Sequence, residues 1–278
     1  MRFKKTVSTA NSRLVLLASC FVAISISACQ PFESDSAHAA EQVWSCTTKD
    51  APFSYSACGI DMQALMADNY QLKLFWQDAN KQPLLTFASL LNTLPSTQTL
   101  AFAMNAGMYN DRYAPIGYTV IAGEEKRALN LKEGGGNFHL LPNGVIWWDQ
   151  TGKVQITESH ALAKLIDDKQ ANIWYATQSG PMLVIDGKIH PKFNAKSTSA
   201  KFRNGIGICS AGNDINIQMV NSDEPVNFYQ FAKLFKDDLN CSNALFLDGG
   251  IASALYAPTI DKHDKKDMGV MIGVLELK

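Results

Sequence analysis

Several common signatures of cofactor and nucleophile chemistry are missing from this sequence. There is no C-x-x-C pair, and none of its five histidines is at metal-ligand spacing from a cysteine. No glycine-rich loop ends in Gly-Lys-Ser/Thr, and Ser179 lacks the G-x-S-x-G elbow of serine hydrolases. We therefore expect no metal and no cofactor, and we expect His139 and His190 to be structural.

Basic runs flanked by aromatic residues are also missing, and the formal net charge of the 278 residues is only −1. A chain with this balance has no electrostatic reason to bind nucleic acid, so no nucleic-acid partner is expected. Nothing in the sequence predicts a protein partner either.

Long apolar runs are scarce, and the one at residues 14–26 is too short for a comfortable membrane span. It follows four basic residues, as in a secretory signal peptide over residues 1–28. Ile26-Ser27-Ala28-Cys29 resembles a bacterial lipobox, which predicts a lipidated Cys29 and a tether at 29–43. The alternative is ordinary cleavage after residues 37–39 (Ala-His-Ala).

The residue after the lipobox cysteine is Gln30, not aspartate, which favours an exported protein anchored to the outer membrane, facing the periplasm. Loss of residues 1–28 removes four basic residues, so 25 basic and 26 acidic residues become 21 and 26, a net charge of −5. The remaining domain at 44–278 shows no second linker and no repeat.

Four cysteines remain in the predicted domain, and an oxidising compartment favours two disulfides. Three pairings are possible. Cys46–Cys58 is favoured because the two residues are close in sequence, and Cys209–Cys241 follows by elimination.

Turn chemistry dominates the middle of the chain. Glycine-containing turns join β-rich runs within residues 118–130, 138–156 and 182–193. Further strands are expected at 204–211, 213–220 and 268–276. Helices are expected at 87–94, at 159–168 and at 227–239, where Asn227 and Gln230 resemble a capping box. These patterns predict an α+β fold with largely antiparallel, twisted sheets built from hairpins and a few segregated helices.

Polar residues stand beside glycines where several predicted strands begin or end. The stretch ALFLDGGIASALYAP puts a carboxylate after an apolar run and lets a backbone or ligand approach the glycines that follow. A tight turn formed by the aspartate would explain this stretch alone. The pattern recurs, however, and the candidate residues are Asn105, Gly107, Asn137, Ser179, Gly180, Arg203, Asp248, Gly249 and Gly250.

Taken in order, MNAGMYND, GGNFHLLPNG, ATQSGPMLV, RNGIGI and LFLDGGIASALY resemble the phosphodiester glycosidase family, over roughly residues 75–277. That family includes the uncovering enzyme N-acetylglucosamine-1-phosphodiester α-N-acetylglucosaminidase and bacterial exported proteins. This chain departs from the family pattern at Ala106-Gly107 and at Ile251-Ala252-Ser253.

The resemblance implies hydrolysis of a sugar-1-phosphodiester in the cell envelope, with a sugar phosphate or glycan as substrate. Asp248 would act on the ring side, as base or nucleophile. Arg203, Ser179 and the Gly180 amide would hold the phosphate. The amides of Asn105 and Asn137 would bind sugar hydroxyls, with Gly107, Gly249 and Gly250 allowing close approach. The alternatives are a non-catalytic glycan-binding or phosphopolymer-binding lipoprotein and a hydrolase of ordinary glycan links such as those of peptidoglycan.

Overall fold

The computed structural model describes residues 43–67, 69–250, 253–263 and 266–278. The predicted signal peptide, Cys29 and the tether up to residue 42 lie outside the described residues, as do Ile251 and Ala252. No helix in the described ranges combines the length and the apolar character that a membrane span requires.

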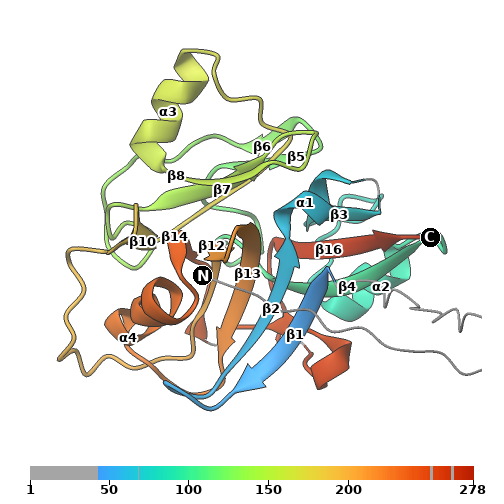
Figure 1. The fold of residues 1–278 in the computed structure, drawn as a ribbon. Helices are drawn as coiled ribbons and strands as arrows, with labels where there is room; N and C mark the ends of the chain where they lie inside the picture. Colours follow the sequence, from blue (N-terminus) through green and yellow to red (C-terminus); the bar gives the residue numbers. More distant parts are fainter. Residues whose placement is uncertain (1–42, 68, 251–252, 264–265) are drawn as a thin grey trace, which may run out of the picture. The chain divides into compact units, whose positions relative to one another are not determined.

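Three sheets form the framework of the described chain (Figure 1). All of the strand pairs recorded between their strands in the described ranges are antiparallel, which confirms the predicted fold class. The seven-stranded sheet has the order β1 (Trp44–Lys49), β2 (Tyr55–Asp61), β13 (Asp214–Ser222), β12 (Asn204–Ala211), β14 (Cys241–Phe246), β10 (Met182–Ile185), β11 (Lys188–Ile189).

The four-stranded and five-stranded sheets complete the framework. The four-stranded sheet has the order β15 (Leu255–Tyr256), β4 (Gln98–Asn105), β16 (Met271–Leu277), β3 (Tyr70–Phe75). The five-stranded sheet has the order β6 (Glu124–Arg127), β5 (Thr119–Ile121), β9 (Tyr175–Ser179), β7 (Gly144–Trp148), β8 (Val154–Glu158).

The three sheets share one apolar core, which contains Phe102 and Met104 of β4, Ile146 of β7 and Ile206 of β12. Side chains alternate between the two faces of a strand, so Ala103, between Phe102 and Met104, belongs to a different cluster. Each sheet therefore buries a second apolar face on its other side.

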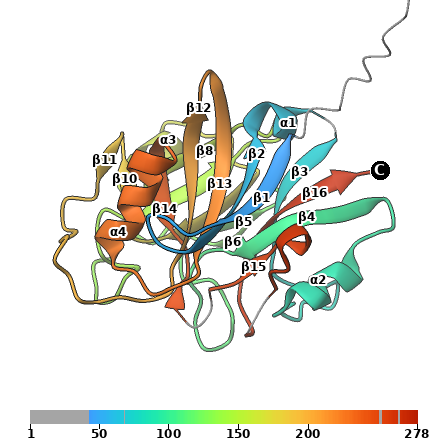
Figure 2. The same cartoon turned by 60° about the horizontal axis from the view of Figure 1, so that its bottom comes forward.

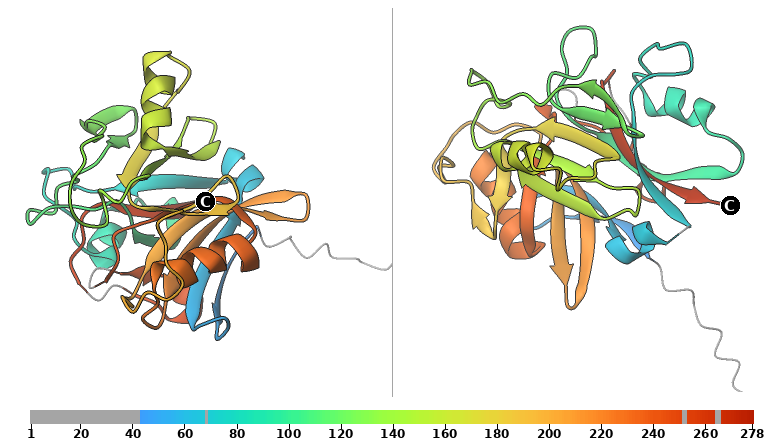
Figure 3. Two further views of the ribbon diagram at one scale, coloured as in Figure 1. Left: turned by 90° about the vertical axis from the view of Figure 1, so that its left-hand side faces the viewer. Right: turned by 90° about the horizontal axis from the view of Figure 1, so that it is seen from above.

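Helices cover those second faces (Figures 1 and 2). The helix α2 (Phe87–Thr93) packs on the four-stranded sheet, and α3 (Ser159–Asp167) packs over β7 and β8. Figure 3 shows α3 standing on the outer side of its sheet. The helix α4 (Phe228–Lys233), with a π-helical turn at Leu234–Asp238, packs on β10 and β14, and the short α1 (Met62–Met66) links β2 to β3.

Alternating glycines in β12 make room for α4 and its π-helical continuation. A Cβ at Gly205 would lie 3.2 Å from the ring of Phe231, and one at Gly207 would lie 2.8 Å from the ring of Phe235. Ile206, on the opposite face, is fully buried in the shared core. The NGIGI motif is therefore a strand with one smooth face that accepts a helix carrying phenylalanines.

Most of the predicted elements are present. The strands predicted at 204–211, 213–220 and 268–276 correspond to β12, β13 and β16, and the three predicted helices correspond to α2, α3 and α4 with its π-helical turn. The capping box between Asn227 and Gln230 is confirmed in both of its hydrogen bonds. Both favoured disulfides, Cys46–Cys58 and Cys209–Cys241, join directly paired strands.

One predicted strand is wrong. Residues 138–141, expected to pair across the Pro142-Asn143-Gly144 turn, form turns and bends, and His139 is therefore not in a strand. The backbone here is held differently: the Phe138 carbonyl accepts a hydrogen bond from Asn143 Nδ2 at 2.8 Å, and Leu140 N donates to Asn137 O. Side chain to backbone bonds of this kind compete with strand pairing. Only the second turn of this stretch, at Thr151-Gly152, forms a hairpin, between β7 and β8.

Candidate functional site

The turn after β14 is the centre of the candidate site. It carries Asp248 and Gly249, and two other chain segments, around Ala106 and at residues 202–204, hold its backbone. Asp248 N donates to Ala106 O at 2.9 Å, Leu247 N donates to Asn204 O at 3.0 Å, and Gly250 N donates to Phe202 O at 2.9 Å. Segments far apart in the sequence thus converge where β4, β12 and β14 end or begin.

A pair of buried asparagines braces this turn. The Asn105 amide nitrogen donates to the Asp248 carbonyl, while its side-chain oxygen accepts from Asn204 Nδ2 at 2.7 Å and from Ala254 N at 3.0 Å. Both asparagines are fully buried. Asn105 therefore positions the segment that carries Asp248, and its carbonyl oxygen is already fully used within the protein. The predicted contact of its amide with sugar hydroxyls stays a prediction.

The carboxyl group of Asp248 is only partly accessible to solvent. No hydrogen bond or ion pair to this carboxyl is recorded among the residues that the structure describes. Burial therefore raises its pKa from 3.8 to about 7, because the charged form loses solvation without a compensating partner. At neutral pH this group exists in comparable amounts as acid and as carboxylate, which suits a proton-transfer role or a nucleophile.

Tyr109 lies close enough to Asp248 to respond to its charge. Burial first, and then the Asp248 charge, raise the pKa of Tyr109 to about 12, so its phenol stays protonated. The hydroxyl donates to Asp267 O at 3.2 Å, and the ring stacks on Tyr113 at 5.6 Å between centroids. Gly269 is needed beneath this ring, because a Cβ there would lie 2.7 Å from it.

Ser179 and Gly180 reach the same region from the end of β9. Pro181 O accepts from Phe246 N at 3.1 Å, which ties this segment to the end of β14. Gly107 packs on the same strand, since a Cβ there would lie 2.6 Å from Gln178 O. The Ser179 side chain is fully buried, and its hydroxyl has no hydrogen-bond partner among the described residues.

The loop after β6 contributes its backbone. A Cβ on Gly180 would lie 2.8 Å from Phe138 O and 3.4 Å from Asn137 O, so glycine allows this loop to approach. The Asn137 side chain itself is exposed. Asn137, Gly107 and Gly180 therefore join the assembly mainly through backbone packing.

Arg203 is placed differently from the other candidates. Its backbone adjoins the Asp248 turn, but its side chain is 3% exposed, with Nε donating to Val226 O at 2.8 Å and Nη2 to Ser199 O at 3.2 Å. The guanidinium lies 3.6 Å from the centre of the Phe228 ring. Burial lowers its pKa to about 10, and no acidic group lies within ion-pair distance of it in the described part of the chain.

The ring of Phe246 contacts both sides of this arrangement. Its centre is 5.6 Å from the Arg203 guanidinium carbon, and its tip is 2.7 Å from the Cβ position of Gly249. The guanidinium and the Asp248 turn thus share one aromatic wall, but they do not pair directly. The phosphate-binding role of Arg203 stays a prediction.

Two residues of the site were missed from sequence. Asn204 is buried, but only its neighbour Arg203 was predicted as a site residue. A polar side chain inside the strand motif RNGIGI was a usable signal for it. Its side-chain oxygen has no partner among the described residues and lies 3.2 Å from the Cβ position of Gly249. Tyr109 lies within MNAGMYND, in which only Asn105 and Gly107 were predicted to be site residues.

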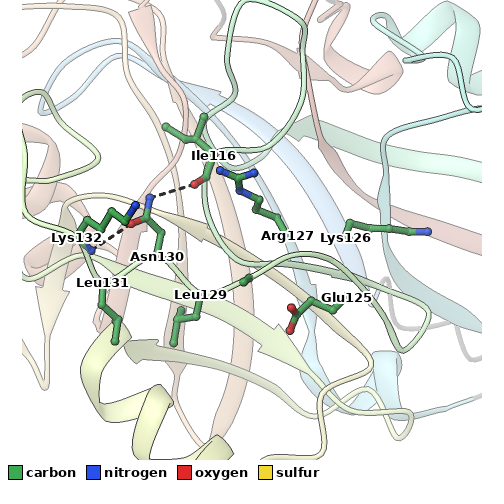
Figure 4. Close-up of a pocket in the computed structure, with 9 residues that line it drawn as sticks. Ile116, Glu125, Lys126, Arg127, Leu129, Asn130, Leu131 and Lys132 are labelled. Atoms are coloured by element: carbon green, nitrogen blue, oxygen red, sulfur yellow. Dashed lines mark hydrogen bonds between the residues drawn. The ribbon is translucent and has the colours of Figure 1, made fainter.

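One cavity adjoins the site and another does not. The first, of about 580 Å³, includes Gly250 and Ser253 in its lining. The second, of about 440 Å³, is lined by Ile116 and residues 125–132, and its described lining contains none of the predicted site residues. Figure 4 shows this second cavity, with Arg127 directed toward Ile116 and Lys126 extending away from it.

The fold and the convergence at Asp248 define an α+β protein with a carboxylate site between sheets. Residues 98–275 match the model of the phosphodiester glycosidase family, which is more than half of the chain. The chain belongs to this family. The matched region runs from the first residue of β4 into β16 and includes every predicted catalytic and substrate-binding residue.

Individual relatives agree with this assignment. The chain is 38% identical over 184 residues to the uncharacterized protein YigE of Escherichia coli K12, covering 66% of this chain and 68% of YigE. A hypothetical protein from Synechocystis aligns with a TM-score of 0.58 at 13% identity, over 84% of this chain and 62% of that chain.

The catalytic domain of zebrafish N-acetylglucosamine-1-phosphodiester α-N-acetylglucosaminidase, auto-inhibited by its pro-peptide, aligns with a TM-score of 0.55 at 14% identity. The alignment covers 85% of each chain. At this level of identity, the two structural likenesses establish the fold.

Proposed function

We propose that this protein is a hydrolase that cleaves the bond between a sugar C1 and the phosphate of a sugar-1-phosphodiester. Membership of the phosphodiester glycosidase family supports this reaction class. The observation that carries the proposal is Asp248, a carboxyl with a pKa of about 7 on a turn held by two other segments of the chain.

In the proposed reaction the C1–O bond breaks and its electron pair leaves with the phosphate. Positive charge develops on the ring, and a carboxylate beside C1 stabilises it. A phosphate monoester is a good leaving group, so protonation of the leaving oxygen is less important than in an ordinary glycoside. Water, or Asp248 followed by water, then forms the new bond to C1, and the proton lost by water passes to the carboxylate.

We assign the donors for the departing phosphate to Ser179 and Arg203. The Ser179 hydroxyl is buried and has no described partner. Arg203 is a buried cation without a described acidic partner, and part of its guanidinium fork is not engaged by the two backbone carbonyls it contacts. An anion in reach of these groups would compensate the cost of burying them.

The test is a substrate panel of aryl glycosides, sugar-1-phosphodiesters and cell-wall fragments. We expect release of sugar from the phosphodiesters alone. Binding without release would favour a glycan-binding or phosphopolymer-binding protein, and release from wall fragments would favour a hydrolase of ordinary glycan links. Either outcome contradicts the proposal.

We further propose that the protein is exported and anchored by lipid on Cys29. The sequence around residues 26–29 supports this, and the two disulfides fit an oxidising compartment. Labelling cells with a radioactive fatty acid should mark the wild type and not Cys29→Ser. Recovery of the Cys29→Ser variant in the membrane fraction at wild-type levels would contradict the anchor.

A further inference from the structure

A cavity of about 580 Å³ begins where the Asp248 turn ends. Gly250, Ser253, Phe202 and Pro225 are among the residues that line it. Gly250 N donates a hydrogen bond to Phe202 O at 2.9 Å, so these two lining residues are neighbours. One wall of the cavity therefore lies two residues after Asp248 in the chain.

The lining of the cavity carries excess positive charge. Among the residues that the structure describes, three lysines and one aspartate line it, which gives these residues a net charge of +2. Asp223 is already compensated, because Lys262 Nζ lies 2.7 Å from one of its oxygens and Ser56 Oγ donates to the other at 2.7 Å. Lys201 and Lys266 are exposed, and neither has an acidic partner within ion-pair distance among the described residues.

Two polar atoms in the lining have unused hydrogen-bonding capacity. Ser253 Oγ and Asn221 Oδ1 are both buried without a partner in the described part of the chain, and both residues line the cavity. A hydroxyl can donate to an acid oxygen, while an amide oxygen can accept only from a donor such as a hydroxyl. Beside them, Phe202 leaves 43% of its surface exposed, which offers an apolar wall.

The geometry points to a second anion subsite. This inference rests on the proposed function: the cavity binds a further acidic group, phosphate or carboxylate, on a hydroxylated leaving half of the substrate. The preferred substrate then carries at least one negative charge beyond the phosphate of the bond that breaks. Buried polar groups without partners and an uncompensated charge are the features that such a ligand would satisfy.

The cavity is distinct from the place proposed for the reacting phosphate. Asp248, Arg203 and Ser179 do not line it, and its cationic groups come from residues 201, 262 and 266 instead. The net charge of +2 on its described lining residues is therefore not balanced by the reacting phosphate. A second anionic group accounts for both observations.

Binding of three small probes tests the inference independently of any hydrolysis. The probes are glycerol 1-phosphate, glycerol 1,3-bisphosphate and 3-phosphoglycerate, and isothermal titration calorimetry measures the Kd of each. The wild type should bind the two probes with a second acidic group more tightly than glycerol 1-phosphate. In a Lys201→Ala/Lys266→Ala variant these two probes should bind about tenfold more weakly, and glycerol 1-phosphate less than about twofold more weakly.

Matched variants guard against indirect effects. Lys153→Ala removes an exposed lysine on the β7–β8 hairpin and should change none of the three Kd values. Lys201→Arg/Lys266→Arg keeps both charges and should retain most of the affinity. The 3-phosphoglycerate arm shows whether a carboxylate can replace the second phosphate.

Three outcomes overturn the inference. Equal loss of affinity for all three probes in the alanine variant means that the cavity holds the reacting phosphate. Equal affinity of the wild type for all three probes, or no binding, removes the subsite altogether. If phosphodiesters are hydrolysed but one of these three outcomes is found, the subsite is rejected and the proposed function remains. If the expected binding pattern is found without hydrolysis, the subsite remains and the proposed function is rejected.

Discussion

Gln178 and Ser179 are adjacent in β9 and both buried, yet their side chains are treated in opposite ways. The Gln178 amide oxygen accepts from Tyr118 N at 2.9 Å and from Asn130 N at 3.0 Å. Its nitrogen donates to Asn130 O at 2.7 Å and to Ser159 Oγ at 3.0 Å. The hydroxyl of Ser179, one residue later, has no partner among the described residues.

The two side chains are therefore expected to differ in role: Gln178 stabilises the fold, and Ser179 is free to bind a ligand. A buried amide with all four hydrogen bonds made fastens the segments just before β5 and after β6 to β9 and has nothing left for a ligand. A buried hydroxyl without a partner costs free energy unless something else satisfies it. The same contrast applies to Asn204 and Arg203. Among the described residues, the Asn204 side-chain oxygen beside Gly249 has no hydrogen-bond partner and the Arg203 charge has no acidic partner.

The largest expected effect is on catalysis and concerns Asp248, whose carboxyl, like the Ser179 hydroxyl, has no partner among the described residues. Asp248→Asn keeps the backbone bonds of the turn but removes the ionisable group, so hydrolysis of a sugar-1-phosphodiester should fall by about 10³-fold or more. The measurement is kcat/KM at pH 7. Asp186→Asn is a matched control, since Asp186 also precedes a glycine after a strand and is exposed. Near-normal turnover of Asp248→Asn would remove this carboxyl from the chemistry.

The same carboxyl should make stability depend on pH. Its pKa is raised on folding from 3.8 to about 7, so folding favours the protonated form. The stability that this adds is complete below about pH 4 and is lost as the pH rises toward and past 7. Across that window the wild type should lose on the order of 4 kcal/mol relative to Asp248→Asn. Urea unfolding of both proteins between pH 4 and 8 measures the difference, and parallel curves would contradict the raised pKa.

A substitution of Gln178, whose side chain makes all of its hydrogen bonds, should change stability and not catalysis. Gln178→Leu leaves Tyr118 N and Asn130 N without their acceptor, so the free energy of unfolding should fall by about 3 kcal/mol. Gln155→Leu on β8 of the same sheet is the control and should stay within about 0.5 kcal/mol of the wild type. A Gln178→Leu protein of unchanged stability would remove the basis for contrasting the two residues.

Arg203→Lys tests whether the buried guanidinium serves more than packing. Lysine keeps the charge but cannot make the forked contact with a phosphate, so kcat/KM should fall by about 100-fold. It also cannot bond both Val226 O and Ser199 O, so some stability is lost, and activity is compared well below the Tm. Arg127→Lys is an exposed control. Lower stability with an unchanged rate would restrict Arg203 to a structural role.

Much of this molecule follows from its sequence, because local rules and tertiary packing agree there. The Asp186-Gly187 turn predicted a hairpin and one is found, and Asn227 with Gln230 predicted the helix start. Asn105 and Asp248 were predicted to lie at one site from polar residues beside glycines at strand ends, and a hydrogen bond joins them. The place of Ser179 in that site stays a prediction. Glycine is needed at Gly107 and Gly180 because another backbone approaches each of them too closely for a Cβ atom.

Other features depend on contacts that no local pattern encodes. The predicted strand at 138–141 is replaced by turns, because Asn143 bonds the Phe138 carbonyl and the Gly180 segment packs against this loop. The direction of the Arg203 side chain depends on Val226 and Ser199, which lie on a separate connection. The bracing role of Asn204 depends on Asn105, 99 residues earlier.

The smallest expected effect compares two serines, one hydrogen-bonded to the Gln178 side chain and one that follows Gln178 in the chain. Ser159 Oγ accepts from Gln178 Nε2, whereas Ser179 Oγ has no described partner, and both residues are fully buried. Ser159→Ala should therefore lower stability by about 1 kcal/mol and leave kcat unchanged. Ser179→Ala should leave stability unchanged, because it removes an unsatisfied hydroxyl, and lower kcat/KM about tenfold by removing a donor to the phosphate. Loss of stability in Ser179→Ala with full activity would make both serines structural. Ser179 would then have no role in catalysis, and Gln178 and Ser179 would differ only in their hydrogen bonds.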